Sequence, residues 1–116
     1  MKISLRRKNE VHIFDLDGEV DFHTSPELRA QLLKAIEQQS SRILINLKKV
    51  SYIDSSGLAT FVEALQKSKR ANSRIVLAQL ESAVRSVFEI ARLDGVFSLA
   101  DSEDEALDML SRSDTR

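Results

Sequence analysis

The apolar residues of the chain fall into short runs that predict β-strands. Two runs of β-branched and large apolar residues occupy positions 3–16 and are separated by the polar stretch 7–10, as is typical of a β-hairpin. Three later runs, at 42–47, 74–78 and 96–99, have the length and composition of buried strands. The chain should therefore form an antiparallel hairpin followed by three further strands.

Between and after these runs, apolar residues recur at the spacing of α-helices. The first helix should begin near Thr24, because Thr24 and Glu27 have the spacing of a capping box and Pro26 is tolerated in a first turn. It should end near residue 39. Three more helices are expected at 54–70, at 82–92 and from about residue 102 onward.

Strands that alternate with helices imply crossover connections and a largely parallel sheet. We therefore expect an α/β fold in which a mixed sheet joins the N-terminal hairpin to the parallel strands, with four α-helices. The 116 residues fit one domain, which we assign to residues 1–110. Residues 111–116 contain no apolar side chain and are expected to form a disordered tail.

Composition narrows the classes of function. Hydrophobic residues make up 42% of the chain, no segment is apolar enough to span a membrane, and the N-terminus lacks the pattern of a secretory signal. These observations favour a cytoplasmic protein. The absence of cysteine excludes disulfides and thiolate chemistry, and the balance of 17 basic and 18 acidic residues argues against direct nucleic-acid binding. A protein or small-molecule partner is expected instead.

The second helix presents two serines in its first turn, after an aspartate, Asp54, that should cap it. Its apolar stripe is expected to consist of Leu58, Phe61, Val62 and Leu65. A rotation of about 100° per residue then puts Ser55 at the edge of this stripe and Ser56 on the opposite side. That opposite side would also carry Thr60, Glu63 and Lys67. The Ser56 hydroxyl should therefore project into solvent.

The first turn of a helix favours an anion, because its N–H groups lack intrahelical partners and the helix dipole is positive there. A phosphate on Ser56 should be tolerated, and Gly57 would leave the flank of the hydroxyl bare for a partner or an enzyme to approach. The simpler interpretation is that Asp54 and Ser55 cap the helix and Ser56 is an ordinary exposed residue. The pentapeptide 54–58 on its own favours that simpler interpretation.

A family resemblance changes this balance. The string from Leu47 to Leu58 resembles the signature of STAS domains, the family of anti-sigma factor antagonists, and the segment from Gly18 to Asp21 resembles a second motif of that family. The resemblance extends over residues 3–110. It implies that Ser56 is phosphorylated by a serine/threonine kinase that is also the anti-sigma factor. The unphosphorylated form would bind this kinase and free the sigma factor, and a metal-dependent serine phosphatase would regenerate it.

The resemblance also implies which residues meet the partner: Asp21 and Ser25 near the phosphorylation site, and Asp54 and Ser55 beside the target. The full set predicted for partner binding is Asp21, Ser25, Asp54, Ser55, Gly57, Thr60 and Glu63. No catalytic residue, cofactor or metal is expected. An alternative is a scaffold of the same fold, a subunit of a transporter or stress-signalling complex, in which Ser56 is never modified.

A remote alternative comes from Asp15 and Asp17, which follow an apolar run and resemble the nucleophile motif of haloacid-dehalogenase-type phosphatases. There one carboxylate attacks phosphorus and the other transfers a proton beside Mg²⁺. The context argues against it, because Asp15 is expected in a hairpin strand and the later acids Asp101 and Asp104 are explained as helix caps. The two histidines, His12 and His23, lack ligand spacing and are expected to be ordinary strand and loop residues.

Overall fold

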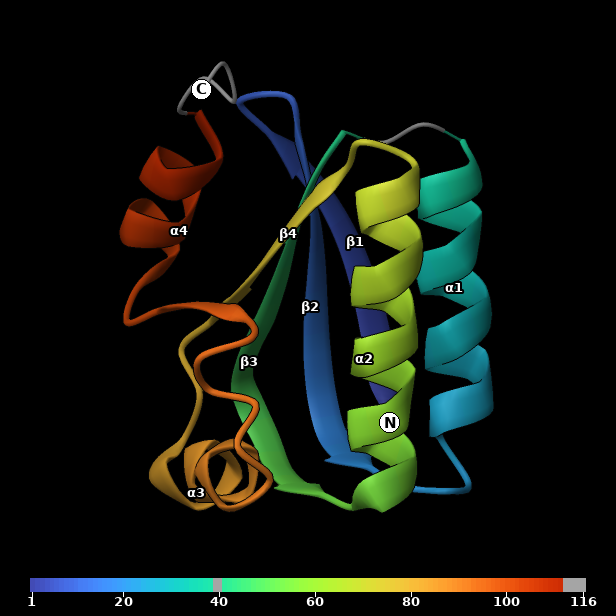
Figure 1. The fold of residues 1–116 in the computed structure, drawn as a ribbon, viewed down its shortest axis with the longest axis vertical. Coiled ribbons are helices and arrows are strands. Elements are labelled where there is room, and N and C mark those ends of the chain that lie inside the picture. Colours follow the sequence, from blue (N-terminus) through green and yellow to red (C-terminus); the bar gives the residue numbers. More distant parts are fainter. Residues whose placement is uncertain (39–40, 112–116) are drawn as a thin grey trace.

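The computed structural model describes residues 1–38 and 41–111, and within them the chain forms five strands and four helices (Figure 1). In chain order these are β1 (Lys2–Lys8), β2 (Val11–Val20), α1 (Ser25–Glu37), β3 (Arg42–Ile53), α2 (Ser55–Arg70), β4 (Arg74–Ala78), α3 (Ser82–Ile90), β5 (Ser98–Ala100) and α4 (Glu103–Ser111). The predicted α/β fold with a mixed sheet and four helices is confirmed.

The strands lie in the sheet in the order β1-β2-β3-β4-β5. β1 and β2 are antiparallel, and β2, β3, β4 and β5 are mutually parallel. Asn9 and Glu10 connect the first two strands with positive φ values of 53° and 62°, the conformation that a two-residue hairpin turn requires. The predicted hairpin is therefore confirmed.

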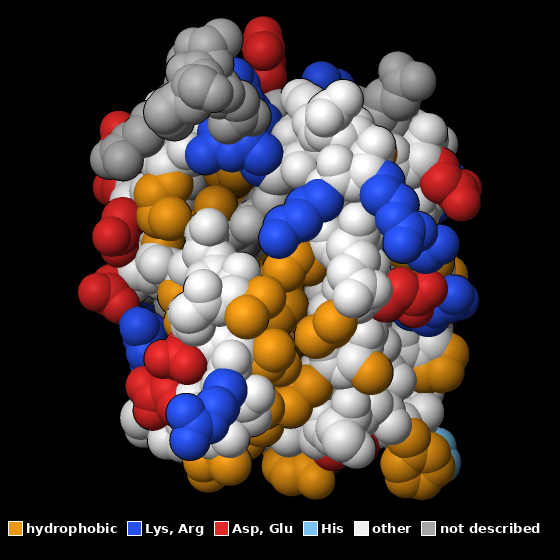
Figure 2. Space-filling view, in the orientation of Figure 1, with side chains coloured by type: hydrophobic (Ala, Val, Ile, Leu, Met, Phe, Trp, Pro, Cys, Tyr) orange, Lys and Arg blue, Asp and Glu red, His pale blue; other side chains and the backbone are white. Residues whose placement is uncertain are grey.

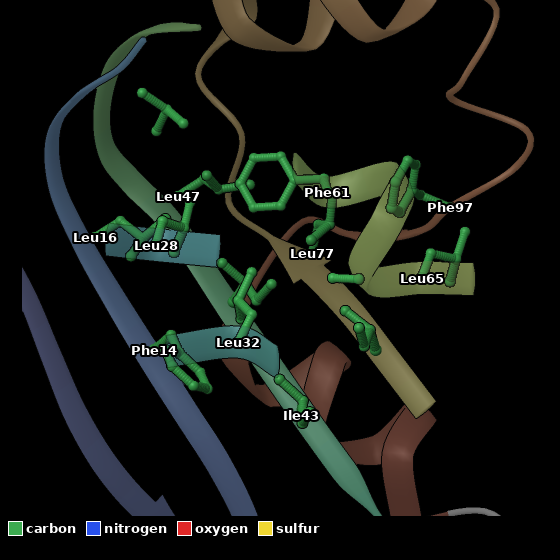
Figure 3. Close-up of a cluster of buried hydrophobic side chains, with 14 of the residues drawn as sticks. Phe14, Leu16, Leu28, Leu32, Ile43, Leu47, Phe61, Leu65, Leu77 and Phe97 are labelled. Carbon is green, nitrogen blue, oxygen red and sulfur yellow. The ribbon is translucent and has the colours of Figure 1, made fainter. Parts of the chain in front are cut away.

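One face of the sheet carries the main core. α1 and α2 lie side by side over this face (Figure 1). α3 adds two buried side chains, Val84 and Phe88, to the same cluster. Because side chains alternate along a strand, this face takes every second residue, such as Phe14 and Leu16 of β2. Figure 3 labels ten members of the cluster: Phe14, Leu16, Leu28, Leu32, Ile43, Leu47, Phe61, Leu65, Leu77 and Phe97.

The other face is covered by α4 over only part of its area. Under α4 the strands present apolar side chains, including Ile13, Leu44 and Val76. Farther along the same face β2 and β3 present Asp15 and Asn46, which are register partners and line a polar depression of about 420 Å³. The nine residues of α4 are too few to reach across the whole sheet, so this part of the face stays polar.

Polar contacts attach α4 to the sheet. One nitrogen of Arg6 in β1, Nη2, donates to Oε1 of Glu103 (2.6 Å) and to Oδ1 of Asp15 (3.0 Å), so three elements share one guanidinium. At the other end of α4, Arg74 donates to the main-chain oxygens of Met109 (2.6 Å) and Leu110 (3.3 Å). These carbonyls belong to the last described turn of α4, so Arg74 ties the end of this helix to β4.

Several strand and helix boundaries, and the cap of α1, differ from the prediction. Thr24 does not form the capping box, because its hydroxyl donates to the main-chain oxygen of Glu19 (2.7 Å) and leaves α1 without a side-chain cap. β3 continues past residue 47 to Ile53, and β5 begins only at Ser98. Of the predicted tail, Ser111 is the last residue of α4, and residues 112–116 lie outside the described part of the chain.

Within the described residues, none of the helices combines the length and the apolar character needed to cross a bilayer.

Candidate functional site

Asp54 fixes the start of α2. Its backbone is extended (φ −111°, ψ −173°), and its Oδ1 accepts the N–H of Gly57 at 3.0 Å. This is the geometry of an N-cap, in which a side-chain oxygen satisfies one of the free N–H groups of the first turn. The predicted cap is confirmed.

Gly57 packs directly against the sheet. A Cβ atom on Gly57 would lie 2.8 Å from Ile53 Cγ1, from Val20 Cγ1 and from the main-chain oxygen of Val20. The same oxygen accepts the N–H of Asp54 at 3.1 Å, so the turn is held on the end of β2. The expectation that Gly57 leaves a bare flank beside the serine is therefore wrong: the missing side chain makes room for the strand, not for a partner.

The buried stripe of α2 is rotated from its predicted position. It consists of Gly57, Thr60, Phe61, Ala64, Leu65 and Ser68, while Leu58 and Val62 are only half-buried. Figure 2 agrees, since hydrophobic side chains reach the surface along the seam beside α2. The predicted solvent position of Thr60 is wrong: its side chain is 6% exposed, and its hydroxyl donates to the main-chain oxygen of Ser56 (3.1 Å). A hydroxyl satisfied within its own helix can be buried at little cost.

This rotation decides which serine faces solvent. At about 100° per residue, Ser55 lies about 160° from Gly57 around the helix axis, whereas Ser56 lies only about 100° from it. In agreement, Ser55 is exposed and Ser56 is half-buried. The structure thus reverses the predicted order, in which Ser56 faced solvent and Ser55 lay at the edge of the buried stripe. The error came from taking Leu58 as the centre of the stripe instead of Gly57.

The loop between β2 and α1 lies beside this turn. Its Asp21 carboxylate accepts the N–H groups of His23 (2.9 Å) and Thr24 (3.1 Å). Partial burial alone would raise the pKa of the Asp21 carboxyl, but the N–H groups of Thr24 and His23 hold this pKa below its ordinary value. Asp21 is therefore ionised at neutral pH and keeps the loop in a fixed turn.

One carboxylate joins the loop to the helix. While Oδ1 of Asp54 caps α2, its Oδ2 accepts the N–H of Phe22 at 3.2 Å. The ring of Phe22 is 65% exposed and lies against His23, with 4.1 Å between the ring centroids. Sequence reasoning missed Phe22, although an aromatic residue in a short polar loop next to Asp21 was a signal that could have identified it.

Two residues predicted to bind the partner are engaged inside the molecule. Ser25, the first residue of α1, is buried at 6% exposure. Glu63 accepts two hydrogen bonds from Arg29 of α1, at 2.6 and 2.8 Å, and this contact lowers the pKa of Glu63. Beside the first turn of α2, Asp21, Phe22 and Ser55 thus reach the surface, whereas Ser25 and Thr60 are buried.

The residues of the phosphatase alternative have other partners. Asp15 lies in the middle of β2, five residues before its end, and both of its oxygens accept hydrogen bonds from Arg6. The acid that meets the same guanidinium is Glu103, neither Asp101 nor Asp104. A carboxylate neutralised by a bidentate arginine is poorly placed to attack phosphorus.

The histidines lie where the sequence predicted, His12 in β2 and His23 in the loop before α1. Across residues 1–38 and 41–111, no three side chains among His, Asp and Glu gather in a way that could hold a metal ion.

Comparison with known proteins shows the family of this chain. The sequence profile of the STAS domain matches residues 2–106. The anti-sigma-B factor antagonist of Listeria monocytogenes is 30% identical over 105 residues, which cover 90% of this chain and 91% of that protein. The structure of unphosphorylated SpoIIAA, an anti-sigma factor antagonist, superposes with a TM-score of 0.75 at 25% identity, covering 97% of this chain and 100% of that one.

The fold itself is shared more closely with an anti-sigma factor antagonist from Mycobacterium paratuberculosis. The two superpose with a TM-score of 0.88 at 21% identity, over 96% of this chain and 94% of the other. A five-strand mixed sheet, four helices and a capped helix start at the end of β3 are thus combined with a profile match over nearly the whole chain. The protein belongs to the STAS domain family.

Proposed function

We propose that this chain is an anti-sigma factor antagonist that works by partner switching. In its unphosphorylated form, the surface formed by Asp21, Phe22 and Ser55 binds a serine/threonine kinase that is also an anti-sigma factor, and the bound kinase releases its sigma factor. Family membership and the relatives named as anti-sigma factor antagonists support this function. The chain acts in the cytoplasm as a binding protein without catalysis, cofactor or metal of its own, and a metal-dependent serine phosphatase restores it after phosphorylation.

The proposed phosphate acceptor is Ser55. The family resemblance pointed to Ser56, but Ser56 is half-buried whereas its neighbour Ser55 is exposed, which favours Ser55 as the acceptor. A kinase must reach the hydroxyl oxygen with its active site, and the exposure of Ser55 is the observation that carries this assignment. A phosphate at this position would also lie beside free N–H groups at the positive end of α2, so the fold tolerates it.

The phosphate would add a charge of about −1.5 to −2 at the contact surface. The acceptor directly follows the carboxylate of Asp54, which in turn holds the main chain of Phe22, the neighbour of the ionised Asp21. The partner is an ATP-dependent kinase, so the phosphates of its own nucleotide face the serine that it modifies. Like charges on both sides of the contact then separate the two proteins, which accounts for the switch.

The test is phosphorylation followed by intact mass measurement. The chain is incubated with ATP and each candidate anti-sigma kinase of the host, in parallel with Ser55→Ala and Ser56→Ala. We expect one added phosphate on the unmodified chain and on Ser56→Ala, and none on Ser55→Ala. A phosphate that is lost only in Ser56→Ala would overturn the choice of acceptor. If no kinase modifies the unmodified chain, the scaffold function is supported instead.

A further inference from the structure

Phe22 is an exposed aromatic side chain on a loop that is held rigidly. Its ring is 65% exposed, although its own N–H is bound by Asp54. The loop around it is fixed by Asp21, which accepts two N–H groups, and by Thr24, whose hydroxyl accepts the N–H of Asp21 (2.9 Å) and donates to the main-chain oxygen of Glu19 (2.7 Å). A large apolar surface is thus presented in one place, with the ring of His23 lying against it at 4.1 Å between the centroids.

Such a residue suits an interface. Aromatic side chains are enriched in the buried centres of protein interfaces, and a few of them provide most of the binding energy. Ordering a flexible loop weakens binding, so a loop already fixed in the free protein avoids that loss. We infer that Phe22 is the apolar anchor with which the unphosphorylated chain holds its anti-sigma factor, by entering an apolar pocket of that partner. The inference rests on the proposed function and adds the contact that provides the affinity.

The position of Phe22 indicates which protein contacts its ring. The kinase must contact Ser55, and Asp54, the residue before it, hydrogen-bonds the main chain of Phe22 at 3.2 Å. A protein large enough to bring an active site to Ser55 therefore also meets the ring. The segment 18–28, on either side of Phe22 in the chain, contains Glu19, Asp21 and Glu27 but no lysine or arginine, so the rim of the pocket on the partner should be basic.

Asp54 couples this anchor to the switch. Its two oxygens have separate functions: Oδ1 caps α2 through Gly57, and Oδ2 holds Phe22. A phosphate on Ser55 would repel the neighbouring carboxylate, and the longer of the two contacts, the one to Phe22, would be lost first. Phosphorylation would then have two effects. It would place a negative charge opposite the phosphates of the kinase's nucleotide, and it would release the loop that positions Phe22.

Binding measurements with matched variants test the anchor. The dissociation constant of the unphosphorylated chain is measured with the kinase that modifies it in the mass assay. We expect Phe22→Ala to raise this constant about tenfold or more. The control is Leu5→Ala, because Leu5 is 63% exposed, close to the 65% of Phe22, but lies in β1 opposite Phe14, about 20 Å along β2 from its end. Leu5→Ala should leave the constant unchanged.

Two outcomes separate this inference from the function on which it rests. If Ser55→Asp prevents binding while Phe22→Ala changes the dissociation constant less than twofold, the switch stands and the anchor is overturned. If the unmodified chain binds none of the host's anti-sigma kinases, the proposed function and the anchor both fail. Circular dichroism spectra and urea midpoints that match for Phe22→Ala and Leu5→Ala would show that both variants are folded.

Amide hydrogen exchange tests the coupling. After phosphorylation the N–H of Phe22 should exchange faster, because its acceptor on Asp54 has moved away. The N–H of His23 is the internal control, since its acceptor is Asp21 and not Asp54. Equal exchange of the Phe22 amide before and after phosphorylation would overturn the coupling, whatever the binding assay shows for the ring.

Discussion

Gly57 leaves no space for even one methyl group, since Val20 and Ile53 occupy the position of its Cβ. We predict that Gly57→Ala lowers the free energy of unfolding by about 1–3 kcal/mol, the usual cost of overpacking. A loss of stability would be informative, because alanine favours a helix over glycine by about 1 kcal/mol and, without the close packing, the substitution would stabilise α2. Urea denaturation measures the difference.

Gly95 provides the matched control. A Cβ on Gly95 would meet nothing within 4 Å. Gly95→Ala should therefore change the free energy of unfolding by less than about 0.5 kcal/mol. If both variants lose the same stability, the close packing of Gly57 on the strand end is not the cause.

The residues of the site were predictable to different degrees. The cap by Asp54 could be predicted, because an N-cap depends only on the local position at the start of a helix. Which of Ser55 and Ser56 faces solvent could not be predicted. Choosing a different centre for the buried stripe, one residue away, rotates the expected buried side of the helix by about 100°. Phe22 could be noticed only as an aromatic residue in a short polar loop, since the hydrogen bond that fixes its position joins it to a residue 32 positions away.

At the level of elements, the contact of β1 and β2 with α4 depends on Arg6. Its side chain is 42% exposed and its partners Asp15 and Glu103 are 34% and 23% exposed, so solvent weakens the attraction. We predict that Arg6→Gln lowers the free energy of unfolding by about 1 kcal/mol, near the upper end for exposed pairs because one guanidinium holds two carboxylates. Hydrogen exchange should quicken mainly in α4. Equal acceleration in α1 would contradict the local role of this contact.

The same contact sets a dependence on pH. Hydrogen bonding from Arg6 holds the pKa of Glu103 below its ordinary value of 4.5 in the folded chain. A lowered folded pKa stabilises the protein above the ordinary value, and this contribution is lost as the pH falls through the folded pKa. The free energy of unfolding of Arg6→Gln, measured by urea titration from neutral to acid pH, should therefore fall less steeply than that of the unmodified chain. Parallel curves would disprove the link.

The sequence predicted each element but not all of its boundaries. β4 was predicted at its observed bounds, since Arg74 to Ala78 is a compact apolar run between polar turns. β3 was predicted to end too early, because Lys48 and Lys49 interrupt the apolar run although the backbone continues beside β2. A strand with one open, polar face cannot be followed from hydrophobicity alone.

On the scale of the whole molecule, Phe88 connects parts that are distant in the chain. It is fully buried, and its ring centroid lies 6.2 Å from that of Phe61 in α2 and 5.6 Å from that of Phe97 before β5. Phe88→Ala should lower the free energy of unfolding by about 3–5 kcal/mol, a large part of the 5–15 kcal/mol typical of a domain. Urea denaturation followed by circular dichroism measures the loss.

Ile90, in the same helix but 83% exposed, is the control. Ile90→Ala should shift the free energy of unfolding by less than about 0.5 kcal/mol. A small effect of Phe88→Ala would mean that α3 is not part of the cooperative core.

The overall architecture could be predicted because the alternation of strand and helix patterns leaves few possible topologies. It could not be predicted that α4 covers only part of its face of the sheet. This partial cover depends on Asp15 and Asn46 becoming neighbours across two strands, which the separate runs do not reveal.

The strands occupy the sheet in the order in which the ribosome makes them, from β1 to β5. Each strand can therefore add to an edge that already exists, and none has to enter between two strands that have already paired. Until β5 emerges from the ribosome, β4 is an open edge of the nascent sheet, and in that interval it is free to pair with a strand of another chain.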